Sequence, residues 1–172
     1  MSFERLLLPY LKRFHTSIHE YGLGFIQIKV GSINYNFYDK RIKRFSNWDA
    51  PHSHQQDFDS TILNGRIIES VFEIIDGDDI AFCGCGNTEM VMEGKTKRIK
   101  TNVWSKGKTY HRAKNEFHTI EDHDDFTITR VYKYGERVDA FVFGRFENYT
   151  PCYTNAELWE MVEEIIKGAS RG

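Results

Sequence analysis

Apolar residues follow the period of a helix at both ends of this chain and the period of strands between them. Near the N-terminus they recur at spacings of three and four, as in an amphipathic helix; they are Phe3, Leu6, Leu7, Tyr10, Leu11, Phe14 and Ile18. We expect a helix over residues 1–22, kinked near Pro9 because proline removes a backbone donor. The apolar face of this helix requires a partner elsewhere in the fold.

The apolar stripe near the C-terminus predicts a second helix over residues 154–168. Thr154 can cap its first turn, Glu157 completes a capping box, and Gly168 suits the position just after the last turn. One face carries Leu158, Trp159, Val162, Ile165 and Ile166. We therefore expect this helix to pack on the rest of the domain as a structural element.

Between the helices, residues 24–150 read as short strands. Aromatic and β-branched runs such as FIQIKV, RIIESVFEII, FTITRVYKY and AFVFGRF are divided by Gly, Asn, Asp and Ser. Many short strands separated by turn residues are typical of a β-sandwich or barrel. The sequence therefore predicts a mainly β domain with the two terminal helices packed outside it.

Length and charge narrow the class of protein. With 172 residues, the chain has the size of one domain, and we expect residues 1–172 to form a single unit. The formal net charge of −2 gives no field that would attract nucleic acid or anionic lipid. Cys83, Cys85 and Cys152 are an odd, sparse set, which favours a reducing cytoplasm. The N-terminal apolar run is too short for a signal peptide or a membrane span, so we expect a cytoplasmic protein.

The candidate chemistry begins at Pro51-His52-Ser53-His54. Residues two apart in a strand point to the same face, so the imidazoles of His52 and His54 can reach one ion. Neutral imidazole binds Fe, Zn, Ni and Cu. Two histidines at this spacing also occur by chance on protein surfaces, so the pair alone does not establish a metal site.

Residues further along resemble the two motifs of the cupin superfamily. The first motif has two histidines, a carboxylate and a glycine that closes a hairpin, and His52, His54, Asp59 and Gly65 resemble it. The spacing of the second motif is met, with three substitutions, by Gly107, Ala113, Asn115, His118 and Asp122. The resemblance implies a cupin-type jelly-roll β-barrel, or double-stranded β-helix. It also implies one divalent metal ion held by His52, His54 and His118, with Asp59 as a candidate fourth ligand.

Strand register decides which carboxylate joins the metal site. Apolar and polar residues alternate over residues 57–62, which points Phe58 into the barrel and both Asp57 and Asp59 outward. This favours a site of three histidines. A bulge in the strand would turn Asp59 inward, and Glu69, four residues after the turn glycine, is a further candidate.

The three-histidine pattern is similar to that of thiol dioxygenases, which are iron enzymes of the cupin class. In those enzymes a glutamate follows the turn glycine and a tyrosine on a later strand assists catalysis, which implies these roles for Glu69 and Tyr132. Arg130 lies two positions before Tyr132, and we expect their shared face to be the interior. Residues 52–69 also resemble short bacterial and phage cupins of unassigned activity, through the signature His-x-His-x-x-Asp-Phe-x-Ser-x-x-Leu-x-Gly-x-x-x-Glu.

These resemblances imply a mononuclear non-haem iron dioxygenase acting on a small polar substrate, with Fe(II) as cofactor and Tyr132, Arg130 and Glu69 as catalytic residues. One alternative is a non-redox isomerase, epimerase or lyase that uses Zn, Ni or Mn as a Lewis acid, with Glu69, Tyr132 or His111 as base. Another is a non-catalytic small-molecule-binding protein, because cupins host many chemistries. We also expect a homodimer or small oligomer, because the aromatic strands exceed what two helices can cover.

Overall fold

The computed structural model describes residues 3–44, 50–84, 87–143 and 151–171, and for residues 3–5, 77–84 and 87–93 it describes the backbone alone. The helices and strands in these ranges are α1 (Phe3–Phe14), β1 (Ser17–Glu20), β2 (Phe25–Val30), β3 (Ile33–Tyr38), β4 (Asp57–Asn64), β5 (Arg66–Gly84), β6 (Asn87–Ser105), β7 (Thr109–Arg112), β8 (Phe117–His123), β9 (Thr127–Tyr134), β10 (Ala140–Phe143) and α2 (Asn155–Ala169). None of the helices in these ranges is long and apolar enough to cross a membrane.

The strands form two sheets, ordered β1-β2-β3-β9-β4-β7 and β10-β6-β5-β8. Neighbouring strands are antiparallel except β10, which runs parallel to β6. Gly65 has a φ of +75° and turns the chain from β4 in the first sheet to β5 in the second, so it forms a corner and not a hairpin. A Cβ atom at Gly65 would lie 2.2 Å from Thr127 Oγ1, so this corner requires glycine.

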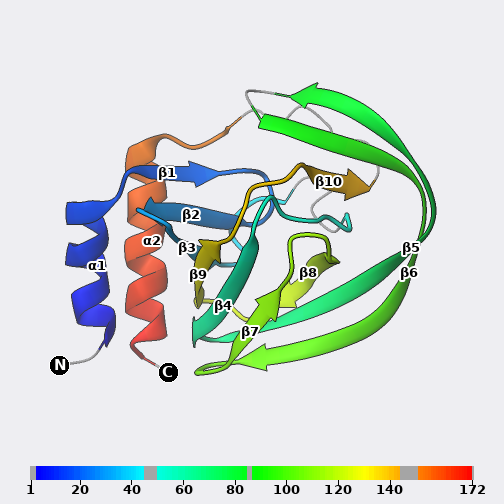
Figure 1. Ribbon diagram of the computed structural model, residues 1–172. Helices are drawn as coiled ribbons and strands as arrows, with labels where there is room; N and C mark the ends of the chain where they lie inside the picture. Colours follow the sequence, from blue (N-terminus) through cyan, green and yellow to red (C-terminus); the bar gives the residue numbers. More distant parts are fainter. Residues whose placement is uncertain (1–2, 45–49, 85–86, 144–150, 172) are drawn as a thin grey trace.

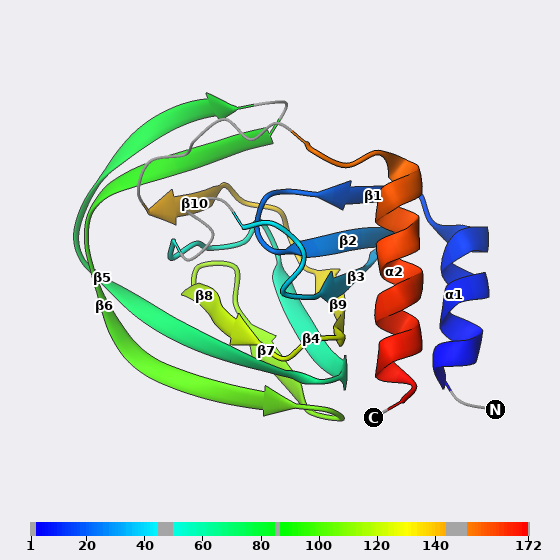
Figure 2. The ribbon, with the colours of Figure 1, turned by 180° about the vertical axis from the view of Figure 1, so that it is seen from behind.

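The helices α1 and α2 lie side by side against the outer face of the six-stranded sheet (Figure 1). Figure 2 shows the same layers from behind, with the four-stranded sheet on the side away from the helices. The core beneath the helices is formed by Leu7, Leu11, Ile26, Ile28, Phe37, Ile128, Leu158, Val162, Ile165 and Ile166. A second core between the sheets is formed by Phe58, Ile62, Ile67, Tyr110 and Val131. The protein is therefore mainly β, with a jelly-roll barrel and a helix from each end of the chain packed outside it.

Both terminal helices differ from the predicted boundaries. α1 ends at Phe14, and residues 17–20 form β1, in which burial alternates as in a strand: Ile18 is buried and His19 is exposed. α2 begins with the predicted capping box but continues past Gly168 to Ala169. Gly168 lies in the last turn, where a Cβ atom would come within 2.5 Å of the Phe126 ring. The glycine is therefore explained by close packing of the helix on the sheet.

The long ribbon of β5 and β6 curves round to close a second ring of strands (Figure 1). Its far part pairs with β10, residues 51–54 bridge β10 to β8, and β8 pairs with the near part of β5. The segment 51–54 is therefore part of this ring. It also borders the main barrel, which is the space enclosed between the two sheets. Neighbouring residues of an extended segment point to opposite sides, so Ser53 faces the ring while the flanking histidines face the barrel.

Candidate metal centre

Three histidine side chains converge inside the main barrel. His52 and His54 come from the extended segment before β4, and His118 comes from β8. One nitrogen atom of each ring lies within 4.8 Å of the others, and the Nε2 atoms of His54 and His118 are 2.8 Å apart. Backbone hydrogen bonds of 3.0 Å in both directions between His52 and His118 hold the two segments in register. The structure therefore brings together the three histidines that the sequence placed at one site.

Two of the rings are oriented by contacts on the nitrogen that faces away from the centre. His52 Nδ1 lies 3.1 Å from the carbonyl oxygen of Ala50, and His118 Nδ1 lies 2.8 Å from Glu69 Oε1. A proton shared in each contact fixes the ring tautomer and leaves the Nε2 lone pair directed at the centre. This is the arrangement that a metal-binding histidine requires.

The histidines of the extended segment are held in their neutral form. Burial lowers the pKa of His52 to about 4, and the neighbouring His118 acts in the same direction. Burial also lowers the pKa of His54 well below its ordinary value. Because only the unprotonated ring binds a metal ion, both rings are ready to bind at neutral pH.

Glu69 is fully buried and supports His118 from behind. Its carboxylate accepts hydrogen bonds from Arg112 Nε at 2.8 Å, Arg112 Nη2 at 2.5 Å, Trp104 Nε1 at 2.8 Å and Asn102 Nδ2 at 3.2 Å. Burial alone would raise the pKa of Glu69, but the hydrogen bonds from His118 and Arg112 lower it to about 2. The predicted role of Glu69 as a free base in the cavity does not fit this arrangement, in which every contact holds the carboxylate ionised and in place.

The partners of Glu69 are not among the residues that the sequence predicts for the site. Asn102 pairs directly with Glu69 across β5 and β6, and Trp104 lies two positions further along the same face. Arg112 lies on β7, in the other sheet. Only the long pairing of β5 with β6 could have indicated the first two residues, and no local pattern marks Arg112.

Asp59 lies outside the metal centre, so its prediction as a ligand is wrong. Its Oδ1 atom is 3.1 Å from His111 Nδ1 and 3.2 Å from the Tyr134 hydroxyl, and 44% of its side chain is exposed. The pairing of β4 with β9 is regular from Asp57 to Ile62, so no bulge turns Asp59 inward. Asp57 also points away and accepts a hydrogen bond from the Lys114 backbone. The predicted alternation, with Phe58 inward and both aspartates outward, is correct.

Tyr132 and Arg130 also lie outside the barrel, which contradicts the prediction that they line the metal cavity. Tyr132 is 47% exposed and stacks on Tyr134 with 5.7 Å between ring centroids, and Arg130 is exposed as well. The apolar residue Ile128 shares their face but is buried beneath the helices, on the outside of the sheet. Apolar character on β9 therefore marked the face covered by the helices, and the interior face carries Thr129, Val131 and Lys133.

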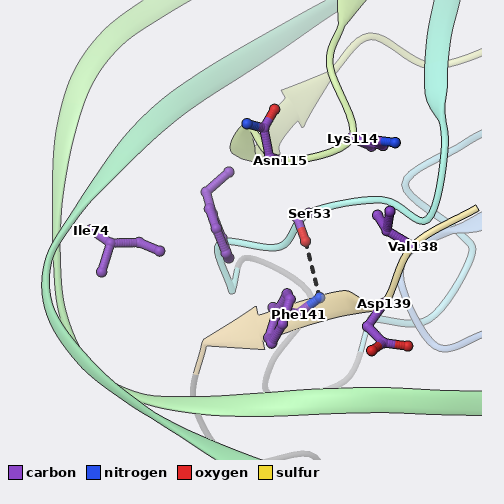
Figure 3. Close-up of a pocket in the computed structure, with 8 residues that line it drawn as sticks. Ser53, Ile74, Lys114, Asn115, Val138, Asp139 and Phe141 are labelled. Atoms are coloured by element: carbon purple, nitrogen blue, oxygen red, sulfur yellow. Dashed lines mark hydrogen bonds between the residues drawn. The ribbon is translucent and has the colours of Figure 1, made fainter.

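A cavity of about 480 Å³ lies next to Ser53, the residue between His52 and His54 (Figure 3). Ser53, Ile74, Phe117, Val138 and Phe141 are among the residues that line it. The Ser53 hydroxyl accepts a hydrogen bond of 3.0 Å from the Phe141 backbone, as Figure 3 shows. Ser53 lies between His52 and His54 in the chain, but none of the three histidines is among the residues that line this cavity. The side chains of Cys83 and Cys85 lie outside the described residues.

Comparisons with known proteins identify no family for this chain. No family model matches it, and no curated protein is significantly similar in sequence. Among solved structures, a chain in the crystal structure of Drosophila melanogaster CENP-C bound to CAL1 is similar, with a TM-score of 0.39 and 5% sequence identity over 76% of this chain and 93% of that chain. Membership of the cupin superfamily therefore stays a prediction, and function is inferred from the histidine centre itself.

Proposed function

We propose that this protein is a metal-dependent enzyme of the cupin type, in which His52, His54 and His118 hold one divalent ion. The observation that carries the proposal is the convergence of three imidazole nitrogens within 4.8 Å on the inner face of the barrel. Neutral nitrogen ligands suit Fe(II), Zn, Ni and Cu. Three protein ligands leave coordination positions for a substrate, as catalytic sites require and closed structural sites do not.

Within this class we propose a mononuclear non-haem iron dioxygenase that acts on a small polar substrate. Fe(II), when bound, supplies the capacity to react with dioxygen, which the side chains of the chain lack. The protein's own residues hold the ion, and Glu69 orients His118 through a hydrogen bond of 2.8 Å. His52 and His54 are partly exposed, which leaves a route for substrate to reach the ion. The sparse cysteines support a cytoplasmic setting.

The non-redox alternative is favoured by one specific observation. Tyr132 and Arg130, which the likeness to thiol dioxygenases placed at the metal, lie on the outer face of the sheet. A centre without them retains what Lewis-acid chemistry requires, namely an ion with open positions. An isomerase, epimerase or lyase that uses Zn, Ni or Mn is therefore the second candidate.

Elemental analysis of protein purified without added metal, combined with oxygen uptake on small thiols, separates these functions. Iron with oxygen uptake supports the dioxygenase, and zinc, nickel or manganese without uptake supports the alternative. Replacing His52, His54 or His118 with alanine should remove most of the metal and leave a folded β protein by circular dichroism. His111→Ala is the matched control, because His111 contacts Asp59 on the outer face. A wild-type protein that takes up no divalent metal would contradict both functions.

A further inference from the structure

The cavity beside Ser53 lies within the second ring of strands. Every part of that ring contributes to its lining: Ile74 comes from β5, Phe117 from β8, Phe141 from β10 and Ser53 from the segment 51–54. Figure 3 shows Ile74 across the cavity from Phe141. The volume of about 480 Å³ is within the range of about 300–1,000 Å³ that small-molecule sites occupy. The ring therefore holds a space large enough for a ligand.

The walls of the cavity are mainly apolar. Phe117 is buried and packs edge-to-face on Phe143, with 5.4 Å between the ring centroids, so this wall is well supported. Ile74 and Val138 also line the cavity, and they are 40% and 41% exposed. Apolar surface in contact with water is unfavourable. A molecule with an apolar body would therefore gain free energy by covering these side chains.

Ser53 supplies a buried hydroxyl group whose proton is not used. The residue is 5% exposed, and its hydroxyl oxygen accepts a hydrogen bond of 3.0 Å from the backbone of Phe141. The hydroxyl donates no hydrogen bond to any described residue. A buried donor without an acceptor is costly, and a ligand that brings an acceptor removes that cost. The cavity thus contains one polar group that can orient a ligand.

The walls are held together by hydrogen bonds without a ligand. The backbone nitrogen of Ser53 donates to the carbonyl oxygen of Phe141 at 2.8 Å, which joins β10 to the segment 51–54. The backbone nitrogen of Val138 donates to the carbonyl oxygen of Gln55 at 2.9 Å, which joins the chain before β10 to the same segment. Ligand sites are usually formed in advance, because ordering them on binding would cost affinity.

The two charged residues that line the cavity have opposite signs. They are Lys114 and Asp139, and Figure 3 shows both charged groups on the side away from Ile74. The Lys114 ammonium donates a hydrogen bond of 3.4 Å to the carbonyl oxygen of Glu136. The lining therefore carries no net charge, and an ion placed against its apolar walls would lose hydration without a countercharge. This favours a neutral ligand.

We propose that this cavity binds a neutral small molecule with an apolar body and one oxygen acceptor, such as a ketone or an ester, which accepts a hydrogen bond from the Ser53 hydroxyl. Ile74, Phe117 and Val138 cover the apolar body. The cavity is lined by none of the three histidines, so this is a second ligand site, and the inference does not rest on the proposed metal centre.

Prodan, or 6-propionyl-2-dimethylaminonaphthalene, is a suitable probe. It is neutral, carries one ketone, and its fluorescence moves to shorter wavelength when it leaves water. The comparison probes are 2-dimethylaminonaphthalene, which lacks the ketone, and the anion 6-dimethylamino-2-naphthoate. Each probe is titrated into the full-length protein with a chelator present throughout. We expect the wild type to bind the naphthoate at least about tenfold more weakly than prodan, because the anion loses its hydration against apolar walls.

Variants of the lining locate the bound probe. Ile74→Asp places a charge on the wall and should weaken prodan binding at least about tenfold. Ile75→Asp is the matched control, because Ile75 is the next residue of β5, is 60% exposed and is not among the lining residues. Ser53→Ala should weaken prodan binding roughly threefold to tenfold, the effect of one neutral hydrogen bond. It should leave the binding of 2-dimethylaminonaphthalene unchanged.

Three results would overturn the inference. The first is wild-type protein that does not shift prodan emission up to the solubility limit of the probe, and the second is equal prodan affinity in Ile74→Asp and Ile75→Asp. The third is unchanged prodan affinity in Ser53→Ala, which removes Ser53 as the donor and with it the proposed ligand class. Where circular dichroism shows a misfolded variant, Ile74→Asn and Ser53→Cys give the same comparisons. A protein that takes up no metal contradicts the proposed function and leaves this inference standing.

Discussion

Replacing Glu69 with glutamine removes the charge that holds His118 and Arg112 in place. The carboxylate is 0% exposed and lies 2.8 Å from His118 Nδ1 and 2.5 Å from Arg112 Nη2, while the Arg112 side chain is 12% exposed. Glutamine keeps the size of the side chain but leaves the guanidinium without a countercharge. Breaking a buried pair on one side costs roughly 3–5 kcal/mol, because the remaining charge stays buried. We expect a loss of about 3 kcal/mol in the free energy of unfolding.

The same change should weaken metal binding. Removing a carboxylate that orients a metal-binding histidine typically lowers metal affinity about 10- to 100-fold. We would measure the free energy of unfolding in urea with a chelator present, and Zn(II) affinity by competition with a chromophoric chelator. Glu73→Gln is the matched control, because Glu73 lies on the same strand, is 51% exposed and pairs loosely with Lys97 at 3.6 Å. We expect it to change stability by less than about 0.5 kcal/mol.

Two results would refute this reasoning. The first is an equal loss of stability in Glu69→Gln and Glu73→Gln, which would mean that the buried network does not stabilise the fold. The second is unchanged Zn(II) affinity in Glu69→Gln, which would mean that His118 needs no support. The double variant with Glu69→Leu and Arg112→Leu should lose less free energy of unfolding than the single variants Glu69→Leu and Arg112→Leu lose together. The reason is that neither charge is left unpaired in the double variant.

Gly65→Ala should lower the free energy of unfolding in urea by more than about 2 kcal/mol, because a Cβ atom would lie 2.9 Å from the Thr127 backbone. Gly107→Ala should lower it by about 1 kcal/mol, because Gly107 also has a positive φ but lies in open space. Equal losses in the two variants would contradict this. Metal-free protein should lose on the order of 2–3 kcal/mol of stability as the pH falls from 6.5 to about 4. The reason is that His52 stays neutral in the folded state, with a pKa of about 4, while the unfolded chain takes up the proton; His52→Gln should flatten that profile. Tyr132→Phe should leave metal content unchanged and stability within about 0.5 kcal/mol, because the side chain is 47% exposed on the outer face. The homodimer stays a prediction, and light scattering that reports a monomer at micromolar concentration would refute it.

Local sequence patterns determined the features that depend on neighbouring residues. The capping box of Thr154 and Glu157 forms as predicted, because its contacts span one helical turn. The alternation that points Phe58 inward and Asp59 outward also holds, because side chains alternate along any regular strand. The spacing of His52 and His54 put both rings on one side for the same reason.

Only the tertiary structure decided which side of each strand is the interior, because both faces of the six-stranded sheet are covered over part of their length. On β9 the helices bury Ile128 on the outer face, so hydrophobicity pointed to the wrong side for Tyr132, which is 47% exposed. The partners of Glu69 come from β6, β7 and β8, separated from it by 33 to 49 positions. Such contacts are set by the pairing of distant strands, and no local pattern records that pairing.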